Sequence, residues 1–314
     1  MKKKLLFTIT LSLICGGFLF AQPKAAGKPK VIVQLSEALK SPVWSNDGKK
    51  LAMTSYGNSG IWIVDASGLN LKQITADQGA GYKMKWSADN STILARTSVL
   101  ENRCVFNEVK AYNVETKSEE LILPKTRQLK GMPYWSNDKS KVLYKVGTET
   151  RSSKPVAKAV PLKSQADVPG EMLLRRMVED PALVAGEVSG LSEFKGRIIF
   201  NPVLSPAGDK IVFQVGGEGL LICDADGSNM KRLGEGENAS WTPDGKYVIA
   251  SVVKDDGRVV TKGELFAIDV NTGARSAILA SDAYVALRPA ISPDGKKLAF
   301  EEYASGAIYV IDLK

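Results

Sequence analysis

The chain has 314 residues, of which 44% are hydrophobic and 24% are charged, and its formal net charge is +8. This is the composition of a globular protein with a sizeable core, not of a disordered or fibrous one. The sequence contains no histidine, which excludes a Ser-His-Asp or Cys-His catalytic arrangement and any metal site that includes histidine.

The N-terminal segment has the pattern of a secretory signal peptide. Lys2, Lys3 and Lys4 precede an apolar run that ends at Phe20, and Ala21 supplies a small residue for cleavage. We therefore expect residues 1–21 to be removed and the mature protein to be periplasmic. The alternative is a lipoprotein modified at Cys15, but Ile14 stands where a small residue is needed, so we favour the plain signal peptide.

The mature chain keeps 39 basic and 34 acidic residues, a net charge of +5. The basic residues are scattered, so we expect no nucleic-acid partner, and no later apolar run reaches the ~18 residues of a membrane span. Cys104 and Cys223 could form a disulfide in a secreted protein. They fall in separate repeats, however, which favours two free thiols.

A six-residue phrase recurs six times along the chain. Each copy opens with a large apolar residue and continues with Ser or Thr, and the first, fifth and sixth copies then place Asp and Gly in the order that suits a tight hairpin turn, while the second has Asn90 in place of the glycine. The copies begin at Trp44, Trp86, Trp135, Leu204, Trp241 and Ile291, which we call the lead residues. The third copy has Lys139 where a left-handed residue is needed, so we expect that hairpin to be the most distorted.

The lead residues recur at intervals of 42, 49, 69, 37 and 50 residues. A period near 40 with four short strands in each unit predicts a six-bladed β-propeller of four-stranded antiparallel blades. In each blade, strand A ends at the lead residue and strand B follows the turn. Strand C is expected at Ile61–Asp65, Val109–Val114, Leu220–Asp224, Leu265–Asp269 and Ile308–Asp312. Strand D is expected at Lys72–Thr75, Glu120–Leu123, Lys231–Leu233 and Ser276–Leu279.

The last unit stops after its strand C, whereas an extra strand, Lys30–Leu35, precedes the first unit. We expect this strand to complete the sixth blade and close the ring, which removes an open sheet edge. Proline stands two residues before the lead residue in four of the six units. Because proline cannot donate to a strand ladder, this column predicts that strand A is the innermost edge strand.

Residues 22–314 are expected to form one propeller with an insertion at about 147–196. Within the insertion, the sequence predicts a strand at Val156–Leu162 and a helix at Glu171–Glu179. We expect the charged connection Lys254–Lys262 of the fifth unit to be a mobile hairpin.

The phrases at Trp241–Lys246 and Ile291–Leu298, each followed by an apolar strand, resemble the PD40 (WD40-like) repeats of TolB-like β-propellers. The resemblance implies a periplasmic protein of the cell envelope that binds other proteins. TolB itself carries an α/β domain before its propeller. Only about ten residues separate the expected cleavage site from the first strand here, so the resemblance is to a stand-alone propeller without that domain.

Two groups of residues that could be binding sites are better explained by structural roles. Asp224–Asn229 resembles the start of a calcium loop, but it has no glycine at the sixth loop position, and a glutamate stands at the twelfth, Glu235, only if the count is made to start at Asp224. We therefore interpret it as a turn. The Trp lead residues are interpreted as core between blades. We therefore expect no metal and no cofactor.

Propellers usually bind at the mouth of the central channel. The residues three places before the lead residues are expected to ring that mouth: Ser41, Lys83, Met132, Asn201, Asn238 and Arg288. Lys83 and Arg288 make the ring cationic, and Asn201 and Asn238 can form hydrogen bonds, so we expect this site to bind an anionic group. The alternative is a hydrated funnel with a structural role.

Two functions remain open from the sequence. The first is a monomeric, non-catalytic scaffold that binds an envelope protein or peptide. The second is a small-molecule or glycan-processing enzyme, or a binder, that uses the channel. The absence of histidine and of an attached catalytic domain favours the scaffold.

Overall fold

The computed structural model describes residues 22–136, 138–157, 173–174, 177–178 and 189–314. The expected signal peptide, with Cys15, lies outside the described residues. Within them, no helix is long and apolar enough to cross a membrane.

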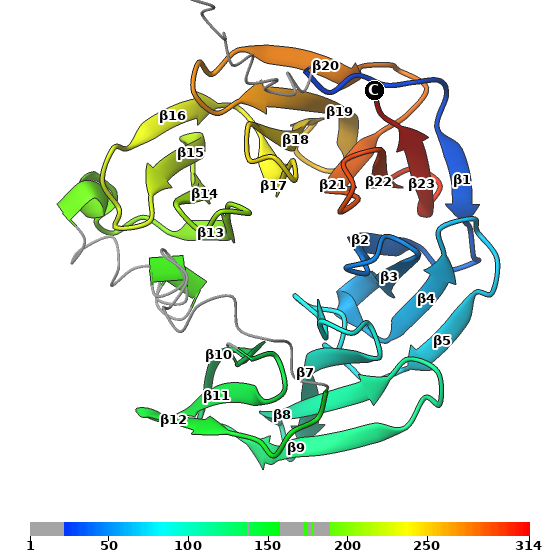
Figure 1. Ribbon diagram of the computed structural model, residues 1–314, viewed down its shortest axis with the longest axis vertical. Helices are drawn as coiled ribbons and strands as arrows, with labels where there is room; N and C mark the ends of the chain where they lie inside the picture. The colour runs from blue at the N-terminus through cyan, green and yellow to red at the C-terminus, as the bar shows by residue number, and fades with distance from the viewer. Residues whose placement is uncertain (1–21, 137, 158–172, 175–176, 179–188) are drawn as a thin grey trace, which may run out of the picture.

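Six antiparallel sheets surround a central channel, as expected for a six-bladed propeller (Figure 1). Blade one contains β2 (Leu39–Trp44), β3 (Lys50–Ser55), β4 (Ile61–Asp65) and β5 (Lys72–Thr75). Blade two contains β6 (Lys85–Trp86), β7 (Thr92–Glu101), β8 (Cys104–Asn113) and β9 (Glu119–Thr126). Blade three contains β10 (Leu129–Trp135), β11 (Val142–Val146) and β12 (Glu149–Ser152).

The second half of the ring is more regular. Blade four contains β13 (Ile199–Leu204), β14 (Lys210–Val215), β15 (Gly219–Asp224) and β16 (Lys231–Gly234). Blade five contains β17 (Glu237–Trp241), β18 (Tyr247–Asp255), β19 (Val260–Asp269) and β20 (Arg275–Leu279). Blade six contains β21 (Ala286–Ile291), β22 (Lys297–Glu302), β23 (Ala307–Asp312) and β1 (Lys30–Val33).

The prediction that the N-terminal strand closes the ring is confirmed. Strand β1 pairs antiparallel with β23, and Lys30 lies opposite Val310 (Figure 1). The pairing continues before β1, because Ala26 N donates to Asp312 O at 2.7 Å and Lys24 N donates to Lys314 O at 3.1 Å. Both ends of the chain therefore hold blade six together.

The repeated phrase forms the expected A–B turn. In the first copy, Ser45 Oγ donates to Asp47 Oδ1 at 2.7 Å, and Lys50 N donates back to Ser45 Oγ at 2.9 Å. This exchange explains why Ser or Thr precedes Asp by two residues in most copies. Lys139 adopts the left-handed conformation with φ +59°, and its N–H donates to Ser136 O as in the other copies. The described residues of this turn therefore keep the hydrogen bond of the other copies and do not show the distortion expected there.

The Trp lead residues pack between blades and connect them. Trp44 Nε1 donates to Ala290 O at 2.8 Å, Trp86 Nε1 to Val43 O at 3.2 Å, and Trp241 Nε1 to Val203 O at 3.1 Å. Each indole thus bonds the preceding blade's innermost strand, which confirms the core interpretation. Trp135 is the exception, because its buried Nε1 has no partner among the described residues.

The region after blade three differs from the sequence prediction. Strand β12 occupies 149–152, within the range assigned to the insertion, as the third strand of blade three. Val156 and Ala157 lie outside any strand, and residues 158–162 of the predicted strand are not described. Leu173, Leu174, Met177 and Val178 are helical, in agreement with the predicted helix. Leu173 and Met177 pack into the blade-four core.

The B–C connections of blades two and five form long hairpins. Strands β7 and β8 pair over ten positions, from Thr92 to Glu101. Strands β18 and β19 stay paired out to Asp255 and Val260. The expected mobile connection of blade five is therefore mostly a regular extension of its two strands, because the backbone groups at Lys254 and Lys262 lie opposite each other in the ladder.

Candidate functional site

The innermost strands carry an irregular position at the channel in five blades, and in blade two the equivalent residue, Lys83, lies in the turn just before β6. The pairing of strand A with strand B shifts register there in the five blades other than blade two, for example between Lys40 and Val43. Six residues adopt left-handed backbone conformations with φ between +45° and +63°: Ser41, Lys83, Gly131, Asn201, Asn238 and Arg288. We call these six the bulge ring.

In blade three, the bulge residue is Gly131 and not the expected Met132, because the β10–β11 register shifts by two residues there and by one in the other four bulged strand pairs. The other five predicted positions belong to the bulge ring. Left-handed backbone costs a residue with a side chain about 1 kcal/mol, and bulges commonly re-aim side chains beside functional sites. Lys83 and Arg288 keep long charged side chains at positions where glycine would be less strained.

A second ring was missed by the sequence analysis. It consists of the residues ten places after each lead residue: Thr54, Arg96, Lys145, Gln214, Ser251 and Glu301. Each interrupts an otherwise apolar strand B with a polar side chain, a signal that the sequence contains. We call these six the strand-B ring.

Residues of the strand-B ring form hydrogen bonds with the bulge residue of the next blade. Arg288 N donates to Ser251 Oγ at 3.1 Å, and Asn238 N donates to Gln214 Oε1 at 3.2 Å. Arg96 reverses the direction, because its Nη1 donates to Gly131 O at 3.0 Å. Polar side chains on strand B therefore satisfy backbone groups that the bulges expose.

Arg288 is engaged within its own blade. Its Nη1 lies 2.8 Å from both carboxylate oxygens of Glu301, whose side chain is only 5% exposed. The same carboxylate accepts a 3.4 Å hydrogen bond from Ser41 N of blade one. Arg288 thus stabilises a buried carboxylate at the closing seam and is not simply a solvent-facing cation, as the sequence had suggested.

Asn201 and Asn238 lie side by side. Asn201 Nδ2 donates to Gln214 Oε1 at 3.0 Å and to Asn238 Oδ1 at 3.3 Å. The two amides therefore hold the seam between blades four and five.

Lys83 is in a different situation. Among the described residues it forms no ion pair, and it is half-buried. Its Nζ lies 5.6 Å from the centroid of the Tyr82 ring, and the Arg96 guanidinium lies 5.7 Å from the same ring. Burial, and then the charge of Arg96, lower the pKa of Lys83. Two cations therefore share one aromatic ring, and the described residues supply Lys83 with no carboxylate.

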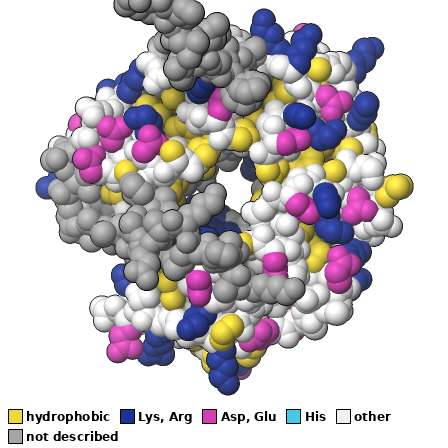
Figure 2. All heavy atoms as spheres, viewed as in Figure 1, with side chains coloured by type: hydrophobic (Ala, Val, Ile, Leu, Met, Phe, Trp, Pro, Cys, Tyr) yellow, Lys and Arg dark blue, Asp and Glu magenta, His cyan; other side chains and the backbone are white. Residues whose placement is uncertain are grey.

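The charges on the channel wall are unevenly divided. We consider three positions in each blade: the bulge residue, the residue before it, and the member of the strand-B ring. In blades one to three these positions hold cations and no carboxylate: Lys40, Lys83, Arg96, Lys130 and Lys145. In blades four to six they hold Glu237, Arg288 and Glu301. Figure 2 shows the central hole, with Lys and Arg side chains on its inner wall.

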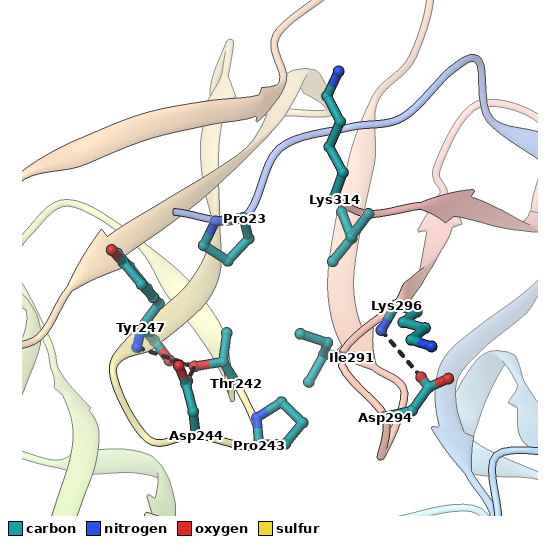
Figure 3. A pocket seen from close by; sticks show the side chains of 11 residues that line it. Pro23, Thr242, Pro243, Asp244, Tyr247, Ile291, Asp294, Lys296 and Lys314 are labelled. Carbon is teal, nitrogen blue, oxygen red and sulfur yellow. Dashed lines mark hydrogen bonds between the residues drawn. The ribbon is translucent and has the colours of Figure 1, made fainter. Parts of the chain in front are cut away.

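A cavity of about 640 Å³ lies at the opposite end of the innermost strands, between the A–B turns of blades five and six (Figure 3). Its wall includes Pro23, Pro243 and Ile291. Its carboxylates serve the turns: Asp244 Oδ1 accepts from Thr242 Oγ1 at 2.6 Å, and Asp294 Oδ1 accepts from Lys296 N at 3.0 Å. No set of polar groups converges on this cavity from its described walls.

The described residues contain no group of three or more Cys, Asp or Glu side chains placed to hold a metal ion. Cys104 and Cys223 carry free thiols in blades two and four. Burial raises the pKa of Cys223 to about 12, so this thiol stays protonated at neutral pH.

No family model and no curated protein matches the sequence. Among solved structures, the chain is similar to TolB from Acinetobacter baumannii, with 16% identity over 91% of this chain and a TM-score of 0.35. It spans 57% of that TolB chain.

Two other solved structures are similar in arrangement. An oligogalacturonate lyase from Vibrio parahaemolyticus has 13% identity, covers 90% of this chain and 79% of its own, and has a TM-score of 0.45. The β-propeller domain of Cps50 (Swd1) from Myceliophteria thermophila has 11% identity, covers 91% of this chain and 100% of its own, and has a TM-score of 0.48. Similarities this weak carry no argument about function, and the propeller assignment rests on the six sheets themselves.

Proposed function

We propose that this protein is a non-catalytic, monomeric scaffold of the periplasm, and that it binds an envelope protein or peptide at one mouth of its channel. The site includes Lys83, Asn201, Asn238 and Arg288, and residues 22–314 form the binding domain. The face is the one that carries the D–A and B–C connections, because the bulge ring lies in the first half of the innermost strand in five blades and, in blade two, in the turn just before β6.

The environment of the Lys83 side chain supports this proposal most strongly. A half-buried cation without a carboxylate partner among the described residues is costly, and it sits on a strained backbone. Folding alone does not require either feature, since glycine fits the conformation and Asn201 and Asn238 fill the same position with neutral groups. An anionic partner would neutralise the cation, and the bulged backbone positions the side chain to meet it.

Capture of the partner in the intact envelope tests the proposal. We expect cross-linking of the wild-type protein to recover a partner and Lys83→Glu to reduce the yield several-fold, because reversal of the charge repels an anion. Lys49→Glu is the matched control, since Lys49 is exposed on an A–B turn at the other end of the channel. Equal capture by Lys83→Glu and the wild type would contradict the proposed face.

Two further measurements test the other parts of the proposal. The mature protein should fractionate with the periplasm, and its intact mass should correspond to a chain that starts near Gln22. Turnover of a glycoside or lactone by the purified protein would overturn the non-catalytic assignment and favour the channel enzyme.

A further inference from the structure

The channel mouth contains a built cationic wall. Blades one to three place five cations on three equivalent positions and blades four to six place one, Arg288, which is held by Glu301. The fold does not require this uneven distribution of charge. Arg96 of blade two forms a hydrogen bond with the backbone of the next blade's bulge residue, and the neutral side chains of Ser251 and Gln214 do the same in blades five and four.

Two pairs of cations lie close together on the wall. Lys130 and Lys145 lie directly opposite each other in the β10–β11 ladder. Lys83 and Arg96 approach the same Tyr82 ring, which attracts both cations although their charges repel each other. A cleft lined by charges of one sign attracts ligands of the opposite sign.

Apolar side chains are exposed in the same blade. At the end of the β7–β8 hairpin, which is the B–C connection of blade two, Leu100 is 74% exposed and Val105 is 56% exposed. Tyr82 is 39% exposed. A partner that meets both the cations and this hairpin must offer carboxylates together with apolar side chains, which a peptide can supply and a polyuronate cannot.

We propose that the part of this wall in blades two and three, formed by Lys83, Arg96, Lys130 and Lys145, is the anion subsite of the channel. We propose further that it binds an acidic peptide segment with neighbouring apolar residues. This inference rests on the proposed function and names its partner's chemistry. Arg288 belongs to the wider site at the channel mouth but not to this anion subsite, because its guanidinium is already bonded to Glu301 at the closing seam. A carboxylate placed between Lys83 and Arg96 would accept hydrogen bonds from both and restore the pKa of Lys83 toward its usual value.

The test uses the mature protein and a fluorescein-labelled oligoglutamate peptide flanked by leucines, with binding followed by fluorescence anisotropy. We expect the double variant Lys83→Gln/Arg96→Gln to bind about tenfold or more weakly, because two charge-assisted contacts are lost. The double variant Lys49→Gln/Lys296→Gln removes the same charge from exposed A–B turns and should bind like the wild type.

Two variants keep the test independent of folding. Arg96 donates to Gly131 O, so its replacement can loosen the seam. Lys83→Gln breaks no described ion pair and should still weaken binding several-fold, whereas Lys83→Arg should retain most of it. An oligoglutamine peptide should not bind measurably to any variant.

Several results would overturn the inference. One is equal affinity of Lys83→Gln, the double variant and the wild type for the acidic peptide. Another is binding of oligogalacturonate without binding of the peptide, which would assign the wall to carbohydrate. If the peptide fails to bind but envelope cross-linking still depends on Lys83, the acidic-peptide inference is wrong while the proposed function stands. If cross-linking is also independent of Lys83, both are wrong.

Discussion

The seam between blades six and one and the seam between blades two and three use equivalent positions for different purposes. At the first seam, Glu301 accepts from Arg288 and from Ser41 N, and the Trp44 indole bonds Ala290 O. At the second seam, Arg96 reaches Gly131 O, but the Trp135 indole has no partner among the described residues.

The difference shows how one repeat can serve both structure and binding. Where the chain closes on itself, polar groups at the channel pair with each other and fix the ring. Around blade two, the described residues supply Lys83 with no carboxylate, and the backbone of Lys83 is in a strained, left-handed conformation. The polar side chains are paired at the closing seam, whereas Lys83 has no carboxylate among the described residues. We therefore expect a ligand to supply the carboxylate around blade two.

Removal of the closing strand should have the largest effect. Deletion of residues 30–35 removes β1 and exposes the edge of β23. We expect aggregation, or a loss of about 10 °C or more in Tm, because the sixth blade loses its outer strand. Size-exclusion chromatography and thermal unfolding measure this. A monomeric protein that melts within a few degrees of the parent would show that β1 is not needed to close the ring.

The closing seam should also be sensitive to a single side chain. Glu301→Ala leaves the Arg288 guanidinium and Ser41 N without their acceptor, and we expect a loss of about 3 kcal/mol in the free energy of unfolding. Gln214→Ala is the matched change at the seam between blades four and five, where the groups are neutral, and should cost about 1 kcal/mol. Denaturant unfolding gives both values. Equal losses would mean that the closing seam has no special role.

Lys83 should show the opposite behaviour. Lys83→Gly relieves the left-handed strain and removes a half-buried cation, so we expect an increase of about 1 kcal/mol in stability together with loss of partner binding. Lys130→Gly, in the regular part of β10, should instead destabilise the protein by about 0.5–1 kcal/mol. If Lys83→Gly is destabilising, the side chain contributes to folding and the division between the two seams fails.

The smallest effect is expected at Glu237, whose pKa is raised by burial despite the opposing charge of Arg288. A carboxyl with a raised folded pKa contributes stability below its unfolded pKa of about 4.3, and this contribution is lost as the pH rises through the folded value. Glu237→Gln should therefore raise Tm by only about 1–2 °C at pH 7, because the group is partly exposed, and have no such benefit below pH ~4. Thermal unfolding of both proteins across this pH range tests the prediction. An increase in Tm that does not change with pH would contradict the raised pKa of Glu237.

Much of the fold could be predicted from the sequence because the turn chemistry is local. Ser45, Asp47 and Gly48 define an A–B turn whose bonds form within six residues, and the repeat then sets the blades. The insertion could not be delimited, since β12 contains Glu149, Thr150, Arg151 and Ser152 with no buried residue to mark a strand.

The candidate site was predicted only in part. The ring positions of Lys83, Asn201, Asn238 and Arg288 follow from their distance to the lead residues. Their roles depend on the strand-B ring, because the partners Gln214 and Glu301 lie on strand B of blades four and six. The strand-B ring was detectable as a polar residue at a fixed interval, but its meaning needed the geometry of the bulges.

Photo-cross-linking from two equivalent positions tests the central claim most directly. Tyr82 and Phe200 precede the bulge residues of blades two and four, and both are partly exposed, at 39% and 44%. A photoreactive phenylalanine analogue at position 82 should cross-link the bound acidic peptide strongly, and the yield should fall when Lys83 is changed to Gln. The same analogue at position 200 should give a much lower yield. Equal yields from the two positions, or a yield at position 82 that does not depend on Lys83, would contradict the division of the channel wall.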